Sequence, residues 1–294
     1  MSCNIVNPAK VSTSRSLEEA TDQPFGPFSV EPHQISQLGL AFSDFVSELL
    51  RIEVAVAGLD GGQLTTTRLV NLADGGVDAG LHRAAATKRI PAGDSAWQFK
   101  AGDLGPAACR TELRDATEAQ DVLRGGGSYR LVLGADLTPA KVKRRRQALE
   151  DEAIALGIAT HDGMFAVLNA SDLAAWTAEY PSLAVSPLLC GIGNVAQPFA
   201  VWSSQYGATG PWVDTDSRSV AINKIREHCE TSTAFDLHVE GVSGVGKTWV
   251  VLEAIRGESI EPLVAYVYTA DALPPALIHH LQAQARHTIL VVDE

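Results

Sequence analysis

The chain has 294 residues and a net charge of −12, and its length favours two domains. Its four cysteines lie far apart and form no C-x-x-C pair, which argues against a disulfide framework or a cysteine zinc site. No apolar run approaches the ~20 residues of a transmembrane helix, and residues 1–30 lack the apolar segment of a signal peptide. We therefore expect a cytoplasmic protein with no membrane partner, whose acidity disfavours a general nucleic-acid coat but is compatible with a local basic groove.

The N-terminal part of the chain predicts an α/β domain over residues 34–185, after a flexible lead-in over residues 1–33 that is rich in Ser, Thr and Pro. Apolar residues recur at three- and four-residue steps between Ile35 and Leu50, which indicates a helix. Shorter apolar or alternating runs indicate strands, and longer periodic runs indicate helices. In order, these are strands over 52–56, 65–72 and 96–100, a helix over 106–123, a strand over 129–133, a helix over 138–156, a strand over 164–168 and a helix over 171–180.

Residues 186–234 join this domain to a second one. They hold Pro, Gly and Gln with Trp202 and Trp212, which predicts a packed connector, and they end in a helix over 216–230. Residues 235–294 then alternate strand and helix, which predicts part of an αβα sandwich. The strands are expected over 235–239, 263–268 and 288–292, and the helices over 249–256 and 276–285.

A carboxylate, an amide and a lysine form a candidate site in the first domain. Asp78 follows a Gly-Gly pair, and Gln98 and Lys100 alternate along one strand, so their two side chains point to the same face. Carboxylate and amide oxygens suit Mg²⁺, which would polarise a scissile phosphate and acidify a water. Lys100 would orient that water or offset the developing charge. We therefore predict Asp78, Gln98 and Lys100 as catalytic residues, with Asp78 and Gln98 as metal ligands.

The segments Gly75-Gly-Val-Asp78 and Gln98-Phe-Lys100 resemble the PD-(D/E)xK restriction-endonuclease family, in its Mrr-like branch. The resemblance covers residues 36–185 and implies a restriction-endonuclease-like fold, metal-dependent cleavage and a nucleic-acid partner, with DNA favoured. In this family the first helix often carries a further acid of the metal site, for which Asp44 and Glu48 are the candidates here. Two other interpretations stay open: Asp78 closes a glycine turn beside a solvated Lys100, or a nuclease-like fold serves only for binding.

The basic run Lys141–Arg146 lies near the start of a predicted helix. It is interpreted either as a solvated helix face or as a contact to a nucleic-acid backbone, which would add salt-dependent affinity without sequence preference.

A glycine-rich loop between a predicted strand and helix matches G-x-x-x-x-G-K-[ST], the pattern of a phosphate-binding loop. Its glycines let backbone N–H groups turn inward around a phosphate, and the following helix directs its positive end at the same anion. The lysine would contact the terminal phosphates, and the threonine hydroxyl would bind Mg²⁺. The predicted nucleotide-binding residues are Gly241, Val242, Ser243, Gly244, Val245, Gly246, Lys247 and Thr248, with Thr248 also a metal ligand.

The sequence closes on an apolar strand followed by Asp293 and Glu294, the second signature of P-loop NTPases. Asp293 is predicted to bind the nucleotide's Mg²⁺ through water, and Glu294 to activate the attacking water. The C-terminal part resembles the STAND and AAA+ families, in which Arg218-Ser-Val-Ala-Ile222 loosely matches an entry segment near the base. Three strands can be counted over 235–294 where a P-loop domain needs about five, so we expect an incomplete P-loop NTPase domain in an N-terminal fragment of a longer protein.

The two resemblances together predict a metal-dependent nuclease effector controlled by an ATP-binding switch. Such a chain is similar to antiviral STAND proteins, in which NTP-driven oligomerisation brings nuclease domains together. The expected cofactors are Mg²⁺ and ATP, and the expected partners are DNA and further copies of the chain. Two alternatives remain: an ATPase whose first domain only binds nucleic acid or a protein, and an NTP-dependent restriction enzyme for modified DNA.

Overall fold

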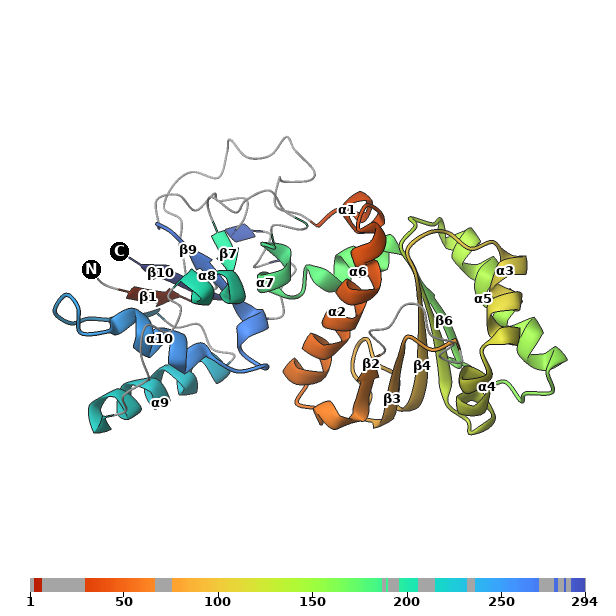
Figure 1. Ribbon diagram of the computed structural model, residues 1–294, viewed down its shortest axis with the longest axis horizontal. Coiled ribbons are helices and arrows are strands. Elements are labelled where there is room, and N and C mark those ends of the chain that lie inside the picture. The colour runs from red at the N-terminus through yellow and green to blue at the C-terminus, as the bar shows by residue number, and fades with distance from the viewer. Residues whose placement is uncertain are drawn as a thin grey trace. The chain divides into compact units, whose positions relative to one another are not determined.

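The computed structural model describes residues 3–6, 30–66, 76–186, 189, 196–205, 215–231, 236–269, 278–279, 283 and 287–293. The chain divides into two compact units (Figure 1). The first unit is Glu31–Ala174, and the second unit joins Met1–Val30 to Ala175–Glu294. Both hold helices and mixed sheets, so the predicted α/β class is confirmed. Across the described residues, no helix combines the length and apolarity that a membrane crossing requires.

The first unit is a five-stranded sheet in the order β2-β3-β4-β5-β6, with helices on both faces (Figure 1). The pairs β2–β3 and β3–β4 are antiparallel, whereas β4–β5 and β5–β6 are parallel. Helix α2 lies across one face, and α3, α4 and α5 cover the other (Figure 1). The strands are β2 (Leu64–Thr66), β3 (Ala79–Ala84), β4 (Gly93–Lys100), β5 (Ser128–Leu133) and β6 (Phe165–Leu168). The helices are α1 (Pro32–Ser36), α2 (Phe42–Val56), α3 (Pro106–Asp115), α4 (Thr117–Arg124), α5 (Pro139–Ala155) and α6 (Ala170–Thr177), which crosses the boundary between the units; the 3-10 turns are η3 (Gly39–Ala41) and η4 (Gly61–Gln63).

The members of the hydrophobic core between the sheet and helices α3, α4 and α5 show which strand residues face these helices. Ala96 of β4 and Tyr129 of β5 belong to that core together with Leu113 of α3. Because side chains alternate along a strand, Gln98 and Lys100 point to the same face as Ala96. The strand that carries the two predicted residues therefore presents them toward α3.

Residues 52–56 were predicted as a strand, and this is wrong: they form the last turns of α2. The alternation Ile-Glu-Val-Ala-Val also continues the helical spacing of Phe45, Val46, Leu49 and Leu50, all of which are buried. No Gly or Pro interrupts the run before Gly58, so the helix continues to the point where a positive φ of 67° ends it.

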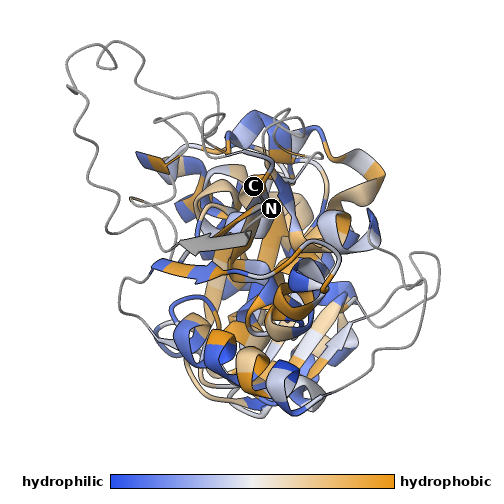
Figure 2. Ribbon diagram, turned by 90° about the vertical axis from the view of Figure 1, so that its left-hand side faces the viewer, coloured by the Kyte–Doolittle hydropathy of each residue, from blue (hydrophilic) through white to orange (hydrophobic). Residues whose placement is uncertain are grey.

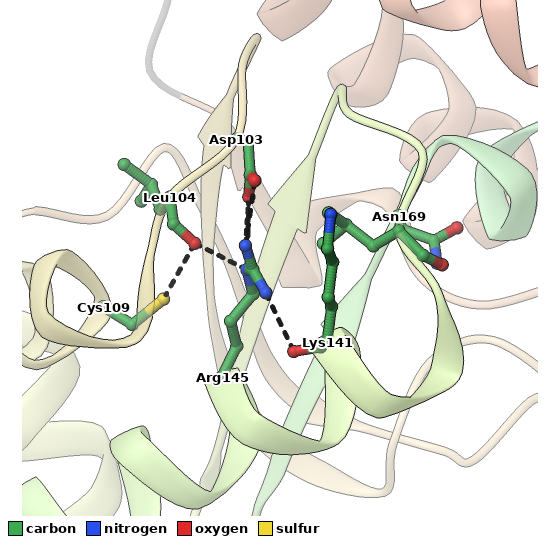
Figure 3. A network of polar contacts seen from close by, with 7 residues as sticks. Asp103, Leu104, Cys109, Lys141, Arg145 and Asn169 are labelled. Atoms are coloured by element: carbon green, nitrogen blue, oxygen red, sulfur yellow. Dashed lines mark hydrogen bonds and ion pairs between the residues drawn. The ribbon is translucent and has the colours of Figure 1, made fainter.

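A buried arginine fastens the loop after β4 to α5 (Figure 3). Arg145 is 5% exposed, and its guanidinium donates to both carboxylate oxygens of Asp103 and to the carbonyls of Leu104 and Lys141. Arg146, the next residue, pairs with Glu150 at 3.4 Å. The run Lys141–Arg146 is therefore not a uniform basic face, because its central arginine is a structural group.

The second unit is also built on a five-stranded sheet, in the order β7-β9-β10-β1-β8. Strands β9 and β10 are parallel, and β1 is antiparallel to both of its neighbours, β10 and β8. Figure 2 shows hydrophobic residues on the strands in the middle of the view, and both hydrophobic and hydrophilic residues on the helices in front of them. The strands are β1 (Cys3–Val6), β7 (Ala196–Pro198), β8 (Asp236–Val239), β9 (Val264–Val267) and β10 (Ile289–Asp293); the helices are α7 (Pro181–Ala184), α8 (Phe199–Gln205), α9 (Asp216–Glu230) and α10 (Lys247–Ile255), with the turn η5 (Glu261–Leu263).

Two segments outside residues 235–294 complete this sheet. Strand β1 belongs to the stretch that was expected to be a flexible lead-in, and the antiparallel pairing of β1 with both β8 and β10 corrects that expectation for Cys3–Val6. Strand β7 comes from the predicted connector, where Trp202 is fully buried and stacks on Tyr266 at 4.6 Å between ring centroids. Trp212 and most of the helix expected over 276–285 lie outside the described residues.

Candidate functional site

In the first unit, the antiparallel pairing of β3 with β4 brings Asp78, just before β3, next to the C-terminal end of β4. Asp78 directly precedes β3, and its backbone N–H donates to the carbonyl of Trp97 at 2.9 Å. Its carboxylate oxygen Oδ2 accepts from the backbone N–H of Phe99 at 2.7 Å. The carboxylate is therefore held against the strand that carries Gln98 and Lys100, as the sequence predicted.

A second carboxylate, that of Glu112 on α3, joins this group and was missed by the sequence reasoning. Its Oε2 accepts from Nε2 of Gln98 at 2.7 Å and pairs with Nζ of Lys100 at 2.8 Å. Helix α3 begins at Pro106, and its residues Cys109 and Leu113 are buried against the sheet. Since Glu112 follows Cys109 by three positions, it lies on nearly the same helix face, a signal that the sequence contained.

The amide of Gln98 is fixed from both ends. Gln98 is 4% exposed, and its Oε1 accepts a hydrogen bond from the hydroxyl of Tyr129, which is fully buried. Burial raises the pKa of Tyr129 well above its ordinary value, and the nearby charges of Glu112 and Asp78 add to the shift. The phenol therefore stays protonated and donates, which leaves Gln98 to donate through Nε2 to Glu112.

The acids of the first helix lie elsewhere. Asp44 and Glu48 are exposed on α2, and Glu48 pairs with Arg51 at 3.1 Å. Helix α2 covers the sheet face opposite to the one that Gln98 and Lys100 share (Figure 1). Neither acid is brought to the Asp78 group, and the second carboxylate found there is that of Glu112 on α3, on the opposite face of the sheet from α2.

The donor atoms of this group suit a hard cation. Over the described parts of the chain, no group of three or more His, Cys, Asp or Glu side chains is arranged to hold a metal ion. Magnesium, however, is commonly bound through one or two carboxylates, with waters and substrate phosphate oxygens completing its shell. Asp78 and Glu112 meet that requirement by chemistry, and Lys100 adds a positive charge beside them.

In the second unit, the glycine-rich loop lies between strand β8 and helix α10, as predicted. Gly244 and Gly246 have positive φ angles of 79° and 90°, which only glycine adopts without strain. Helix α10 begins at Lys247, whose Nζ donates to the carbonyls of Gly241 at 2.9 Å and Val242 at 3.1 Å. The lysine thus folds back over the loop, and Gly241, Val242, Ser243, Gly244 and Val245 are exposed while Gly246, Lys247 and Thr248 are half-buried.

Strand β1 separates the two segments of the predicted nucleotide site. Cys3 pairs with Val239 of β8 on one side and with Asp293 of β10 on the other. At the usual spacing of neighbouring strands, the backbones of β8 and β10 are about 10 Å apart. Asp293 ends β10, and Glu294 lies outside the described residues.

Helix α9 is attached to both ends of α10. Arg226 donates to the carbonyls of Glu253 and Ala254 at the C-terminal end of α10. Arg218 lies at the other end, with Nη2 at 3.5 Å from the carbonyl oxygen of Val245 in the loop. The segment that begins at Arg218 therefore contacts the glycine-rich loop itself.

No family model matches the chain, and no curated protein or solved structure matches it significantly.

Proposed function

We propose that the chain is a magnesium-dependent nuclease whose action is regulated by nucleotide binding to a P-loop. The observation that carries the nuclease part is the convergence of Asp78, Lys100 and Glu112 at one end of β4. The P-loop part is supported by the sequence pattern together with the positive φ angles of Gly244 and Gly246 and the start of α10 at Lys247.

In the nuclease unit, the residues would divide the work of phosphodiester hydrolysis. Bound Mg²⁺ would polarise the scissile phosphate and acidify a water. Asp78, already oriented by the N–H of Phe99, would hold the cation at the end of β4. The ammonium of Lys100 would stabilise the charge that develops on the phosphate, a role that preorganised cations commonly have.

In the P-loop unit, the loop N–H groups and the N-terminus of α10 would bind the oxygens of a nucleoside triphosphate such as ATP. Lys247 would move from the carbonyls of Gly241 and Val242 to the terminal phosphates, and Thr248 would contribute its hydroxyl to the nucleotide's Mg²⁺. Because Arg218 contacts the same loop, helix α9 would respond to the presence of phosphate.

The resemblance to antiviral STAND proteins suggests the setting in which this pairing is useful. DNA cleavage has to be restrained until a threat is present, and a nucleotide-dependent assembly of several copies would provide that restraint. We therefore propose DNA as the substrate, ATP as the regulating nucleotide and self-association as the activated state.

One observation favours a second candidate, in which the first unit binds nucleic acid without cutting it. Lys100 is already neutralised by Glu112. If that ion pair persists with substrate bound, the site cannot direct a free ammonium at a phosphate.

The test is cleavage of linear and supercoiled DNA, and of single-stranded RNA, with Mg²⁺ or with EDTA. We expect Mg²⁺-dependent cleavage of DNA that is lost in Asp78→Asn and Lys100→Met. Asp94→Asn is the matched control, because Asp94 also accepts a backbone N–H on the β3–β4 pair, that of Arg83 at 2.7 Å, but at the far end of β4. Binding of DNA without cleavage under any metal would favour the second candidate, and cleavage that survives both substitutions would refute the first.

A further inference from the structure

The oxygen atoms of Glu112 differ in their surroundings. Oε2 receives both Gln98 and Lys100. Among the described residues, no hydrogen-bond donor reaches Oε1, and the side chain is 27% exposed. One oxygen of this carboxylate is therefore held in place by the protein, while the other remains accessible to a cation from solvent.

Gln98 is arranged in the opposite way. Both ends of its amide are occupied, by the Tyr129 hydroxyl and by Glu112, and only 4% of the residue is exposed. Its Oε1 has a second lone pair, but the residue is almost fully buried, so a cation could reach this oxygen only by losing its waters and displacing the side chains packed around it. Magnesium loses its waters reluctantly, so the amide is better suited to orienting a neighbour than to binding a metal.

We propose that Glu112, and not Gln98, supplies the second metal ligand beside Asp78, and that Gln98 and Tyr129 are positioning residues that orient the Glu112 carboxylate. This inference rests on the proposed nuclease function and names a ligand that the sequence motif does not contain.

The arrangement also assigns Lys100 a dependence on the cation. The positive charge that Glu112 now receives from Lys100 would be supplied by the divalent ion when it binds. The ammonium would then leave Glu112 and become available to the phosphate of the substrate. Binding of the cation to Glu112 would thus release the ammonium of Lys100 from the same carboxylate. The ion pair between Lys100 and Glu112, which favoured a unit that only binds nucleic acid, would then no longer prevent cleavage.

The test is Mn²⁺ binding to the full 294-residue chain, measured by electron paramagnetic resonance of the free ion at a pH near neutrality. Glu112→Gln keeps the shape and the hydrogen bonds of the side chain but removes its charge, and we expect the dissociation constant to rise by roughly tenfold or more. Glu150→Gln is the control, because Glu150 also pairs with a basic side chain, that of Arg146, and its own side chain is 32% exposed, close to the 27% of Glu112. We expect this control to leave Mn²⁺ affinity within twofold of the unsubstituted chain.

A double-mutant cycle distinguishes the role of Gln98. Gln98→Met alone should weaken Mn²⁺ binding, because it loosens Glu112. If Gln98 acts only through Glu112, adding Gln98→Met to Glu112→Gln should change the affinity by less than about twofold. Additive losses would show that Gln98 is a ligand in its own right and would overturn the inference.

The remaining outcomes separate this inference from the proposed function. If Glu112→Gln keeps wild-type Mn²⁺ affinity and DNA cleavage while Asp78→Asn loses both, the inference fails and the nuclease proposal stands. If the unsubstituted chain neither binds Mn²⁺ nor cleaves DNA, both fail.

Discussion

The buried guanidinium of Arg145 provides the sharpest test of how the first unit is held together. Arg145→Ala removes the ion pair in which the guanidinium donates to both carboxylate oxygens of Asp103. It also removes two hydrogen bonds to the carbonyls of Leu104 and Lys141. Removing one partner of a buried ion pair costs about 3–5 kcal/mol when the remaining charge stays buried. The Asp103 side chain is 44% exposed and regains water, so we expect a lower loss of about 2–3 kcal/mol in the free energy of unfolding.

Arg146→Ala is the matched comparison, one position further along the same helix. Arg146 also pairs with an acid, Glu150 at 3.4 Å, but its side chain is 51% exposed. Pairs of this kind contribute about 0.5 kcal/mol or less. The two substitutions remove the same chemical group, so the difference between them measures burial and bonding rather than charge.

Hydrogen–deuterium exchange of the β4 and β5 amides reports the stability of the first unit separately from that of the second. A loss of about 2–3 kcal/mol accelerates exchange by about 30- to 150-fold, whereas Arg146→Ala should accelerate it by about twofold. Because Arg145 also fixes the loop that leads into α3, its loss should weaken Mn²⁺ binding through Glu112. Equal exchange rates in the two variants would refute this account of the loop.

Three further predictions concern the P-loop and the buried thiols. Lys247→Ala should weaken binding of a fluorescent ATP analogue by about 10- to 100-fold, because a charge-assisted contact is lost, with no change in the melting of the first unit. Gly246→Ala forces an alanine to a φ of 90° and should lower nucleotide affinity and local protection from exchange, since this conformation costs an L-residue about 1–2 kcal/mol; unchanged affinity would contradict the strained geometry. Burial raises the pKa of Cys109 from 9.0 to about 11 and that of Cys229 to about 12, so brief alkylation at pH 8 followed by mass spectrometry should leave both unmodified. The unfolded thiols ionise first, so stability should fall as the pH rises from about 9 toward 11.

The sequence allowed much of the first site to be predicted, because strand alternation alone places Gln98 and Lys100 on one face. The same reasoning missed Glu112. In the sequence, Glu112 looks like any glutamate of an amphipathic helix. Its role becomes visible only when α3 is packed against β4 and the carboxylate meets Gln98 and Lys100. Likewise, the motif alone predicted that the side-chain oxygen of Gln98 binds a metal. Only the structure shows that this oxygen accepts a hydrogen bond from the hydroxyl of Tyr129.

The errors in secondary structure have a related cause. The run over 52–56 fits both strand alternation and the end of a helical repeat, and tertiary packing decided between them. The pairing of β1 with β8 and β10 joins residues more than two hundred positions apart, and no local pattern reports such a partner.

That long-range pairing has a consequence for the order in which the protein assembles during synthesis. Ribosomes add about 5–20 residues per second, so β1 leaves the exit tunnel tens of seconds before β8 and β10 exist to receive it. The whole first unit, whose sheet pairs only strands near one another in the chain, can fold in the interval. The second unit can close its sheet only after β10 has been synthesised, and until then Cys3–Val6 is an unpaired strand that a chaperone or a neighbouring nascent chain can capture.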